Sequence, residues 1–288
     1  MSILVIGATG QVGSAVVERL AAAGADVRAM TRNPASYQGP AGVRAVAGDA
    51  NDPASLRAAL QGVDTLFLLS PVAVEELNQG LTVLTLARDA GIQRFVYLSV
   101  LNAEHFTDVP HFTVKYTIER MIEQFDLPAT VLRPSYFMQN DTALKDVAAQ
   151  HGVYPMALGD AGIEMVDIRD IADVATAALL RRARAAGPLP REVIEITGPE
   201  AITGTSAAAT WANELGRDVV YGGSDLDAAE AAIGQNLPAW QAYDLRLMLA
   251  RFHRDGMRGK PAARGTLRTL LGREPRTYAA FVKETAAR

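Results

Sequence analysis

The chain opens with apolar residues, continues with closely spaced glycines, and then shows a helical pattern. Residues 3–6 are four consecutive apolar residues without a charge, which is typical of a strand buried on both faces of a parallel sheet. Beyond the glycines, Val12, Val16 and Leu20 recur on one face of a predicted helix, and Gly24 is placed to end it. The pattern therefore predicts a strand, a glycine-rich turn and an amphipathic helix in succession.

The alternation of strand and helix continues through the first half of the chain. Asp52 and Pro53 are typical of a helix start, with Asp as the N-cap and Pro as the first helical residue. Strands that alternate with helices predict an α/β fold with a doubly wound parallel sheet, whose ligands bind beyond the carboxyl ends of the strands. The further predicted strands are residues 25–32, 43–49, 65–69, 94–99 and 129–132, and the predicted helices are residues 53–62, a long helix ending at 90, and 113–125.

The pattern changes after residue 140, where turn-rich segments interrupt it. A helix ending near residue 180 is predicted next, followed by a short strand at 193–196 that would be the seventh of the sheet. Carboxylates at 75–76 and 167–170 are predicted to be charges at helix starts rather than a catalytic pair. The remaining predicted helices are residues 205–216, 225–234, 237–255 and 276–287.

Three glycines stand at the first turn from strand to helix. Gly7, Gly10 and Gly13 would let the backbone turn tightly and approach a phosphate without a Cβ in the way. The helix that follows adds unpaired N–H groups and the positive end of its dipole. This context predicts a site for the pyrophosphate of a dinucleotide; the alternative is a glycine-rich turn that binds nothing.

The end of the second predicted strand bears on which dinucleotide binds. An Asp or Glu there would accept a hydrogen bond from the ribose 2′-OH and select NAD(H). The chain instead has Arg32 between Thr31 and Asn33, and a guanidinium pairs well with a 2′-phosphate. NADP(H) is therefore the predicted cofactor, with NAD(H) as the alternative, and a solvated surface arginine is the structural alternative.

Composition and charge narrow the function classes. The 288 residues carry a net charge of −4, with 49% hydrophobic and 21% charged residues, so nothing global attracts nucleic acid or an anionic membrane. The absence of cysteine excludes disulfides, thiolate catalysis and cysteine-ligated metals. The basic residues of 251–268 are not interleaved with aromatics, and the four histidines lack a metal-ligand spacing. We expect a cytoplasmic protein, monomeric or homodimeric, that acts on a small molecule without metal, nucleic-acid or membrane partners.

Short motifs follow one another along nearly the whole chain, at residues 7–13, 31–34, 48–53, 95–99, 132–134, 167–172, 196–199 and 272–276. With these motifs the chain resembles the NmrA-like group of atypical short-chain dehydrogenase/reductases. Proteins of similar plan include quinone oxidoreductases, triphenylmethane reductases, isoflavone-type reductases and NADP-sensing transcriptional co-regulators. The resemblance implies a Rossmann domain at 1–150, to which 165–200 returns. It also implies a smaller, mostly helical substrate domain at 151–164 and 201–288.

The resemblance also implies roles for individual residues. The implied cofactor residues are Gly7, Ala8, Thr9, Gly10, Gln11, Val12 and Gly13 at the pyrophosphate, Arg32 at the 2′-phosphate, Asp49 and Ala50 at the adenine, Leu69, Ser70 and Pro71 along the ribose and phosphates, and Ser99, Lys115, Pro134, Ser135, Tyr136 and Phe137 at the nicotinamide half. The implied substrate residues are Tyr136, Phe137 and Asn140.

The catalytic pair of typical short-chain dehydrogenases is incomplete here. Those enzymes place Tyr-x-x-x-Lys on one helix, where the lysine fixes the nicotinamide ribose and lowers the pKa of the tyrosine. This chain keeps Lys115 but has His111 at the tyrosine position, and Tyr116 would project about 100° away from Lys115. Three alternatives follow. His111 donates a proton beside Lys115, or hydride passes directly to an acceptor that needs no positioned acid, or the cofactor binds without turnover. A histidine without a role in chemistry is the structural alternative for His111.

The predicted function is an NAD(P)H-dependent oxidoreductase that transfers a hydride to a small aromatic or conjugated acceptor such as a quinone. Its catalytic candidates are Lys115 and His111, and most of the rate would come from proximity and orientation. The alternative is a non-catalytic redox sensor that binds NADP(H) and a protein partner, which the missing tyrosine favours. An isomerase or epimerase is less favoured, because those relatives normally retain the tyrosine.

Overall fold

The computed structural model describes residues 1–287 and divides the chain into two compact units. Unit 1 comprises residues 1–100, 114–133 and 168–194, and unit 2 comprises 101–113, 134–167 and the chain from 195 onward. No helix within the described part of the chain is long and apolar enough to cross a bilayer. The last residue of the expected substrate domain, Arg288, lies outside the described residues.

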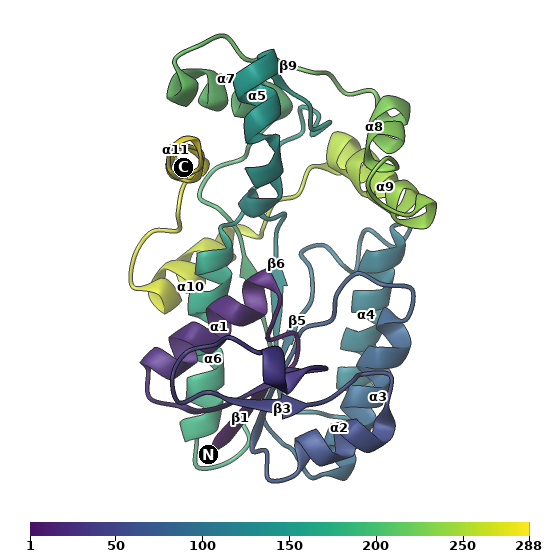
Figure 1. Ribbon diagram of the computed structural model, residues 1–288, viewed down its shortest axis with the longest axis vertical. Helices are drawn as coiled ribbons and strands as arrows, with labels where there is room; N and C mark the ends of the chain where they lie inside the picture. Colours follow the sequence, from purple (N-terminus) through teal and green to yellow (C-terminus); the bar gives the residue numbers. More distant parts are fainter. Residues whose placement is uncertain (288) are drawn as a thin grey trace. The chain divides into compact units, whose positions relative to one another are not determined.

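The main sheet has seven strands in the order β3-β2-β1-β4-β5-β6-β8, and it lies almost wholly in unit 1 (Figure 1). The pairs among β1 to β6 are parallel; Val5 of β1, for example, lies opposite Ala29 and Phe67. The direction of winding reverses between β1 and β4, where doubly wound sheets bind their ligands. The strands are β1 (Ser2–Val5), β2 (Asp26–Thr31), β3 (Arg44–Ala47), β4 (Thr65–Leu68), β5 (Phe95–Leu98), β6 (Ala129–Pro134) and β8 (Glu192–Ile196).

Helices cover both faces of this sheet (Figure 1). On one face α1 packs against α6, and on the other face α2, α3 and α4 cover a continuous apolar core. That core joins Leu60, Val83 and Ile118 of these helices to Leu66 and Tyr97 of the sheet. The helices are α1 (Gln11–Ala22), α2 (Pro53–Leu60), α3 (Glu76–Asp89), α4 (Pro110–Gln124) and α6 (Ile168–Arg184), with a short 3₁₀ helix η1 (Pro34–Ser36).

Unit 2 is mostly helical and includes a small parallel sheet of two strands, β7 (Val153–Tyr154) and β9 (Val220–Tyr221). Its helices are α5 (Lys145–His151), α7 (Gly204–Leu215), α8 (Leu226–Ile233), α9 (Ala239–Asp255), α10 (Pro261–Leu271) and α11 (Tyr278–Ala286), with a 3₁₀ helix η2 (Met138–Leu144).

The predicted fold class and the seventh strand are confirmed, and the local corrections have physical causes. Helix α4 begins at Pro110 rather than near 113, so His111 lies inside its first turn. No helix was predicted where α10 lies; it contains Gly265 and two arginines, and its one buried residue is Leu267. Helix α5 and the two-residue strands β7 and β9 are too short to show a hydrophobic period.

The compact units differ from the expected domain boundaries at residues 101–113, 134–150, 165–167 and 195–200, all of which belong to unit 2. Backbone hydrogen bonds explain the second difference: Ser135 N–H donates to the Ile196 carbonyl at 2.9 Å, and Val166 N–H donates to the Tyr136 carbonyl at 2.8 Å. Such pairings between distant segments leave no sequence signal. The functions assigned to the two expected domains stay predictions.

A buried carboxylate organises polar groups inside unit 2. Asp141 of η2 is fully buried and accepts hydrogen bonds from the hydroxyls of Tyr154 (2.8 Å) and Tyr278 (2.6 Å). Trp211 Nε1 donates in turn to the Tyr278 hydroxyl at 3.0 Å, which links α7 and α11. Burial raises the pKa of Asp141 to about 6, although the two tyrosine hydrogen bonds oppose the shift. The charge of Asp141 also adds to burial in raising the pKa of Tyr136.

We predict that Asp141 makes unfolding free energy fall as the pH rises. Its folded pKa of about 6 exceeds the ordinary 3.8, so its stabilising contribution is complete below pH about 4 and is lost as the pH rises through about 6. The full difference corresponds to about 3 kcal/mol. In urea unfolding between pH 4 and 7, wild type should therefore lose stability relative to Asp141→Asn. The control is Asp160→Asn at an exposed position, which should track wild type. Parallel curves for wild type and Asp141→Asn would contradict the prediction.

Candidate active site

The glycine loop follows β1 and packs closely against its surroundings. Gly7 has a φ of +81°, and a Cβ there would lie 2.7 Å from the backbone oxygen of Leu69, in the loop after β4. A Cβ on Gly13 would overlap the Gly7 carbonyl. A Cβ on Gly10 would lie 3.4 Å from that same oxygen, which is ordinary contact. Packing therefore requires Gly7 and Gly13, whereas Gly10 is exposed and leaves space in front of the helix.

The N-terminus of α1 is left without an internal partner. Gly10 is its N-cap and has no side chain that could accept a hydrogen bond, and the first turn contains no acidic residue. Helix α2 differs, because the Asp52 carboxylate accepts from Ala54 N–H at 2.9 Å. The free N–H groups and the positive dipole end of α1 fit an anionic group such as a pyrophosphate.

A pocket of about 260 Å³ adjoins this loop in unit 1. Its lining includes Thr9 and Ser14 beside the glycines, together with Thr31 at the end of β2. Arg32 is the residue after Thr31, and its exposed side chain makes no ion pair or hydrogen bond within residues 1–287. Glu18 also lines the pocket, so a phosphate bound there requires a nearby cation to offset the carboxylate. Two arginines directly follow lining residues: Arg19 is paired with Asp173, whereas Arg32 makes no ion pair within residues 1–287.

The other residues expected at the adenosine half follow the carboxyl ends of β3 and β4. Asp49 forms a turn before α2: its N–H donates to Ser55 Oγ at 3.0 Å, and its carboxylate accepts from Asn51 N–H at 2.9 Å. Ala50 follows it in this turn, and residues 69–71 leave β4 beside Gly7. The expected cofactor residues of unit 1 thus share the carboxyl edge of the sheet.

Lys115 of α4 is held by a buried ion pair. Its Nζ donates to Glu76 Oε1 at 2.6 Å, and Glu76 is 1% exposed in the first turn of α3. The sequence placed Glu76 correctly at a helix start, but it missed that this carboxylate turns inward to the lysine. An ammonium has three donors, so pairing with Glu76 leaves Lys115 able to donate to further groups.

A second buried network surrounds Ser99. Its hydroxyl donates to Glu119, and Arg133 donates to the same carboxylate through Nε (3.0 Å) and Nη2 (2.6 Å). Tyr97 lies in the same interior with its hydroxyl unpartnered among the described residues, and burial and the charges of Glu76 and Glu119 raise its pKa well above 10. Ser99 was expected near the nicotinamide; the structure gives its hydroxyl a partner inside unit 1.

His111 is paired with a carboxylate from a distant part of the chain. Its backbone N–H donates to Asp244 Oδ1 at 3.1 Å, and its Nδ1 pairs with Oδ2 of the same residue. Asp244 belongs to α9 and is 2% exposed. The sequence analysis missed Asp244, because no spacing or motif connects it with His111. Tyr116 packs under Arg120, whose guanidinium lies 5.0 Å from its ring, as a surface pair.

The expected substrate loop, residues 134–140, is fixed within unit 2. Phe137 bridges to Val166, and Met138 N–H donates to the Val166 carbonyl at 2.9 Å. The ring of Tyr136 packs edge-on against Phe252 with centroids 5.6 Å apart. Pro134 is buried, Asn140 is exposed, and Ser135 Oγ is buried without a partner among the described residues. The roles of these residues toward ligands stay predictions.

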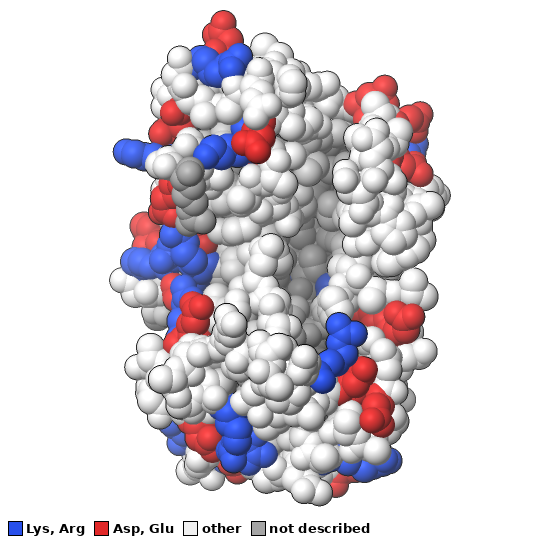
Figure 2. Space-filling model, viewed as in Figure 1, with Lys and Arg blue, Asp and Glu red and all other residues white. Residues whose placement is uncertain are grey.

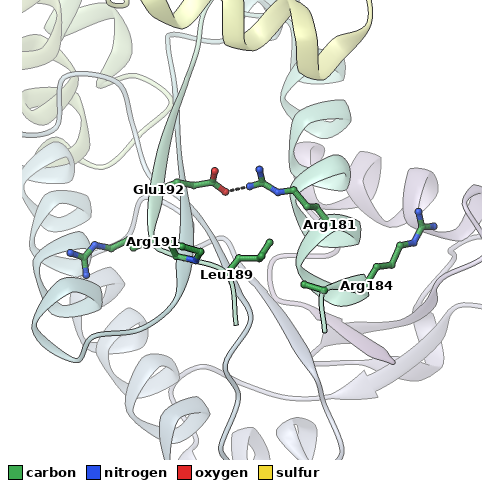
Figure 3. Close-up of a pocket in the computed structure, with 7 residues that line it drawn as sticks. Arg181, Arg184, Leu189, Arg191 and Glu192 are labelled. Carbon is green, nitrogen blue, oxygen red and sulfur yellow. Dashed lines mark hydrogen bonds and ion pairs between the residues drawn. The ribbon is translucent and has the colours of Figure 1, made fainter. Parts of the chain in front are cut away.

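A different pocket, of about 560 Å³, lies where α6 ends and β8 begins (Figure 3). The Arg181 guanidinium faces Glu192 across it and pairs with that carboxylate, whereas the guanidinium groups of Arg184 and Arg191 point away. The charge directed into the pocket is therefore balanced. On the face shown in Figure 2, basic and acidic side chains likewise lie beside one another in several places.

Comparisons with known proteins show which family and which structures the chain is similar to. The sequence model of the NmrA-like family matches residues 1–254. The chain is 31% identical over 288 residues to an NAD(P)H azoreductase of Xenophilus azovorans, spanning 99% of this chain and 98% of that protein. It is 33% identical over 288 residues to the (4-alkanoyl-5-oxo-2,5-dihydrofuran-3-yl)methyl phosphate reductase of Streptomyces griseus, with the same coverage. The NADPH complex of an NADPH-dependent quinone oxidoreductase from Escherichia coli is similar at a TM-score of 0.85 and 29% identity, over 99% of each chain.

We predict that alanine substitution destabilises the protein at Gly13, which is closely packed, but not at Gly10, which has open space beside it. Gly13→Ala should lower the unfolding free energy by about 1–3 kcal/mol, because its methyl group overlaps the Gly7 carbonyl. Gly10→Ala is the matched control and should change it by less than about 0.5 kcal/mol, since its backbone φ of −82° suits alanine. Urea unfolding of both variants measures the difference; equal stabilities would show that the loop relaxes around Gly13.

Proposed function

The chain belongs to the NmrA-like family, and we propose that it is an NADP(H)-dependent reductase of small aromatic or conjugated acceptors, with a quinone as the first candidate. The observation that carries the proposal is the uncapped N-terminus of α1 behind Gly10, because it offers free N–H groups where a dinucleotide pyrophosphate would bind. Relatives that align over nearly the whole chain are named as NAD(P)H-dependent or other reductases, which supports the reaction class.

In this proposal the bound cofactor supplies the hydride, and the residues of the chain position it. The loop from Gly7 to Gly13 holds the pyrophosphate, and Arg32 pairs with the 2′-phosphate beside the pocket that Thr9 and Thr31 line. Asp49 and Ala50 flank the adenine, and residues 69–71 follow the ribose and phosphates. The proposal for this half rests on the shared carboxyl edge of β1 to β4.

Lys115 has the best-supported role at the nicotinamide half. Glu76 holds its ammonium in one place and takes one of three donors, so the others remain for the ribose hydroxyls. Ser99, the loop from Pro134 to Phe137, and Asn140 are proposed contacts of the nicotinamide and the acceptor. A rigid ribose would hold the nicotinamide in one orientation, which is the main way such a site accelerates hydride transfer.

The second candidate function is a redox sensor that binds NADP(H) without turnover. The observation that favours it is His111 at the position where typical relatives have tyrosine, with its imidazole already tied to Asp244. Different affinity for NADPH and NADP⁺, in a protein that oxidises no acceptor, would support the sensor. A cytoplasmic location is also a proposal, supported by the cysteine-free composition and by the cofactor requirement. A monomeric or homodimeric state stays a prediction.

We predict that removing Lys115 lowers NADPH-dependent turnover. A single Lys115→Ala change would remove the lysine that pairs with the buried Glu76 carboxylate, and breaking a buried ion pair from one side costs about 3–5 kcal/mol. The test variant is therefore Lys115→Ala combined with Glu76→Gln, assayed for NADPH oxidation with quinones, enals, azo compounds and cationic dyes. Its kcat/KM should fall by about ten- to a hundredfold, through the lost hydrogen bonds to the ribose. Glu76→Gln alone and the exposed Lys283→Ala are the controls. Unchanged turnover in the double variant would remove Lys115 from the mechanism.

Arg32→Ala should shift the preference from NADPH toward NADH. Loss of one charge-assisted pair with the 2′-phosphate costs about 1.5–3 kcal/mol, so the Kd for NADPH should rise at least about tenfold while that for NADH stays nearly constant. Isothermal titration with each dinucleotide measures this directly. Arg57→Ala, at an exposed arginine of α2, is the matched control. An equal effect on both dinucleotides would contradict the role of Arg32.

A further inference from the structure

We propose that Asp244 and His111 form a carboxylate–imidazole dyad in which Asp244 is a positioning residue and His111 delivers a proton to the reduced acceptor. The proposal rests on the reductase function proposed above and adds a residue, Asp244, that neither the family motifs nor the helix spacing indicates. It replaces the proton donor that is lost with the tyrosine of typical relatives.

The contacts hold the imidazole from two sides. Asp244 Oδ1 accepts the backbone N–H of His111 at 3.1 Å while Oδ2 pairs with the ring Nδ1, so one carboxylate fixes both the residue and its ring. The ring also packs edge-on against Phe112, with centroids 4.7 Å apart. The His111 side chain is 10% exposed, and its Nε2 makes no hydrogen bond within residues 1–287. The second ring nitrogen is therefore available to a ligand.

The chemistry of the carboxylate decides which nitrogen carries the proton. An ionised carboxylate only accepts hydrogen bonds, so Nδ1 of His111 must be the donor toward Asp244. Neutral His111 then has an unprotonated Nε2, and the protonated imidazolium carries its transferable proton there, with its charge stabilised by Asp244. The same logic orients catalytic imidazoles in unrelated enzymes.

The place of His111 on α4 suits this role. It precedes Lys115 by four residues, so the two side chains lie one turn apart on the same helix face. Each of these two side chains is held by a buried carboxylate from another helix, Glu76 of α3 for the lysine and Asp244 of α9 for the histidine.

The proton balance shows which acceptors need the dyad. Reduction of a quinone takes one hydride, with its electron pair, from NADPH and one proton; NADPH is oxidised to NADP⁺, and the hydroquinone keeps both hydrogens. The proton leaves His111 Nε2 for a quinone oxygen, and solvent reprotonates the imidazole. A cationic triarylmethane dye takes the hydride at its central carbon and becomes neutral, so it needs no proton. The dyad should therefore matter for the quinone and not for the dye.

A purely structural role for Asp244 is the competing explanation, because its contact with the His111 backbone also ties α9 to the start of α4. Asp244→Asn separates the two roles. The amide oxygen still accepts from the backbone N–H, but its NH₂ group now faces Nδ1 and favours the tautomer protonated at Nε2. Asp108→Asn is the matched control. Asp108 lies just before α4 and pairs with Arg251 of α9, but it does not touch His111.

The first measurement needs no cofactor. In ¹⁵N-labelled protein, ring nitrogen shifts of the four histidines are recorded at high pH, with His111→Gln to assign the signal. Wild type and Asp108→Asn should show His111 protonated at Nδ1, and Asp244→Asn should move the proton to Nε2. A His111 protonated at Nε2 in wild type, or a tautomer that Asp244→Asn does not change, would overturn the dyad.

The second measurement compares acceptors under NADPH. Asp244→Asn and His111→Gln should each lower kcat for the quinone by about a hundredfold while kcat for the cationic dye stays within about twofold. Equal losses with both acceptors would show a structural role for Asp244. They would contradict the dyad without contradicting the proposed reductase function. No turnover of any acceptor by the wild-type protein would contradict the proposed reductase function and the proton delivery with it, whatever tautomer His111 has.

Discussion

The close approach of Gly13 to the Gly7 carbonyl is the constraint on which the cofactor half of this protein depends. A residue with a side chain does not fit at Gly13, so α1 starts directly against the turn after β1. The same turn packs, at Gly7, against the loop after β4. This packing brings the bare N-terminus of α1 to the point where the sheet reverses its winding. A site for an anion thus follows from backbone packing before any charged side chain is added.

Two buried carboxylates fix the positions of the candidate catalytic side chains of helix α4. Lys115 and His111 would be mobile surface side chains on an isolated helix; Glu76 holds the lysine and Asp244 the histidine in one orientation. Ion pairs of this kind add little net stability, because desolvation of the charges opposes their attraction. Their benefit is order, since positioned donors are what hydride and proton transfer require.

The sequence predicted the fold class, the glycine loop and the family, because each is written in local patterns: apolar runs, glycine spacing and caps such as Asp52 before Pro53. It did not predict the partners of the candidate catalytic residues. Asp244 lies 133 positions from His111, and Glu76 lies 39 positions from Lys115, so only the folded chain joins them. Helix α10 was also not predicted, and its one buried side chain is Leu267.

Direct hydride transfer from a bound dinucleotide can be followed by isotope labelling. The purified protein is given NADPH carrying deuterium at either face of nicotinamide C4, with a cationic triarylmethane dye as acceptor, and the reduced dye is analysed by mass spectrometry. We expect one deuterium at the central carbon from one of the two labelled cofactors and none from the other. Reduced dye without deuterium from either cofactor, or no reduced dye at all, would contradict direct hydride transfer.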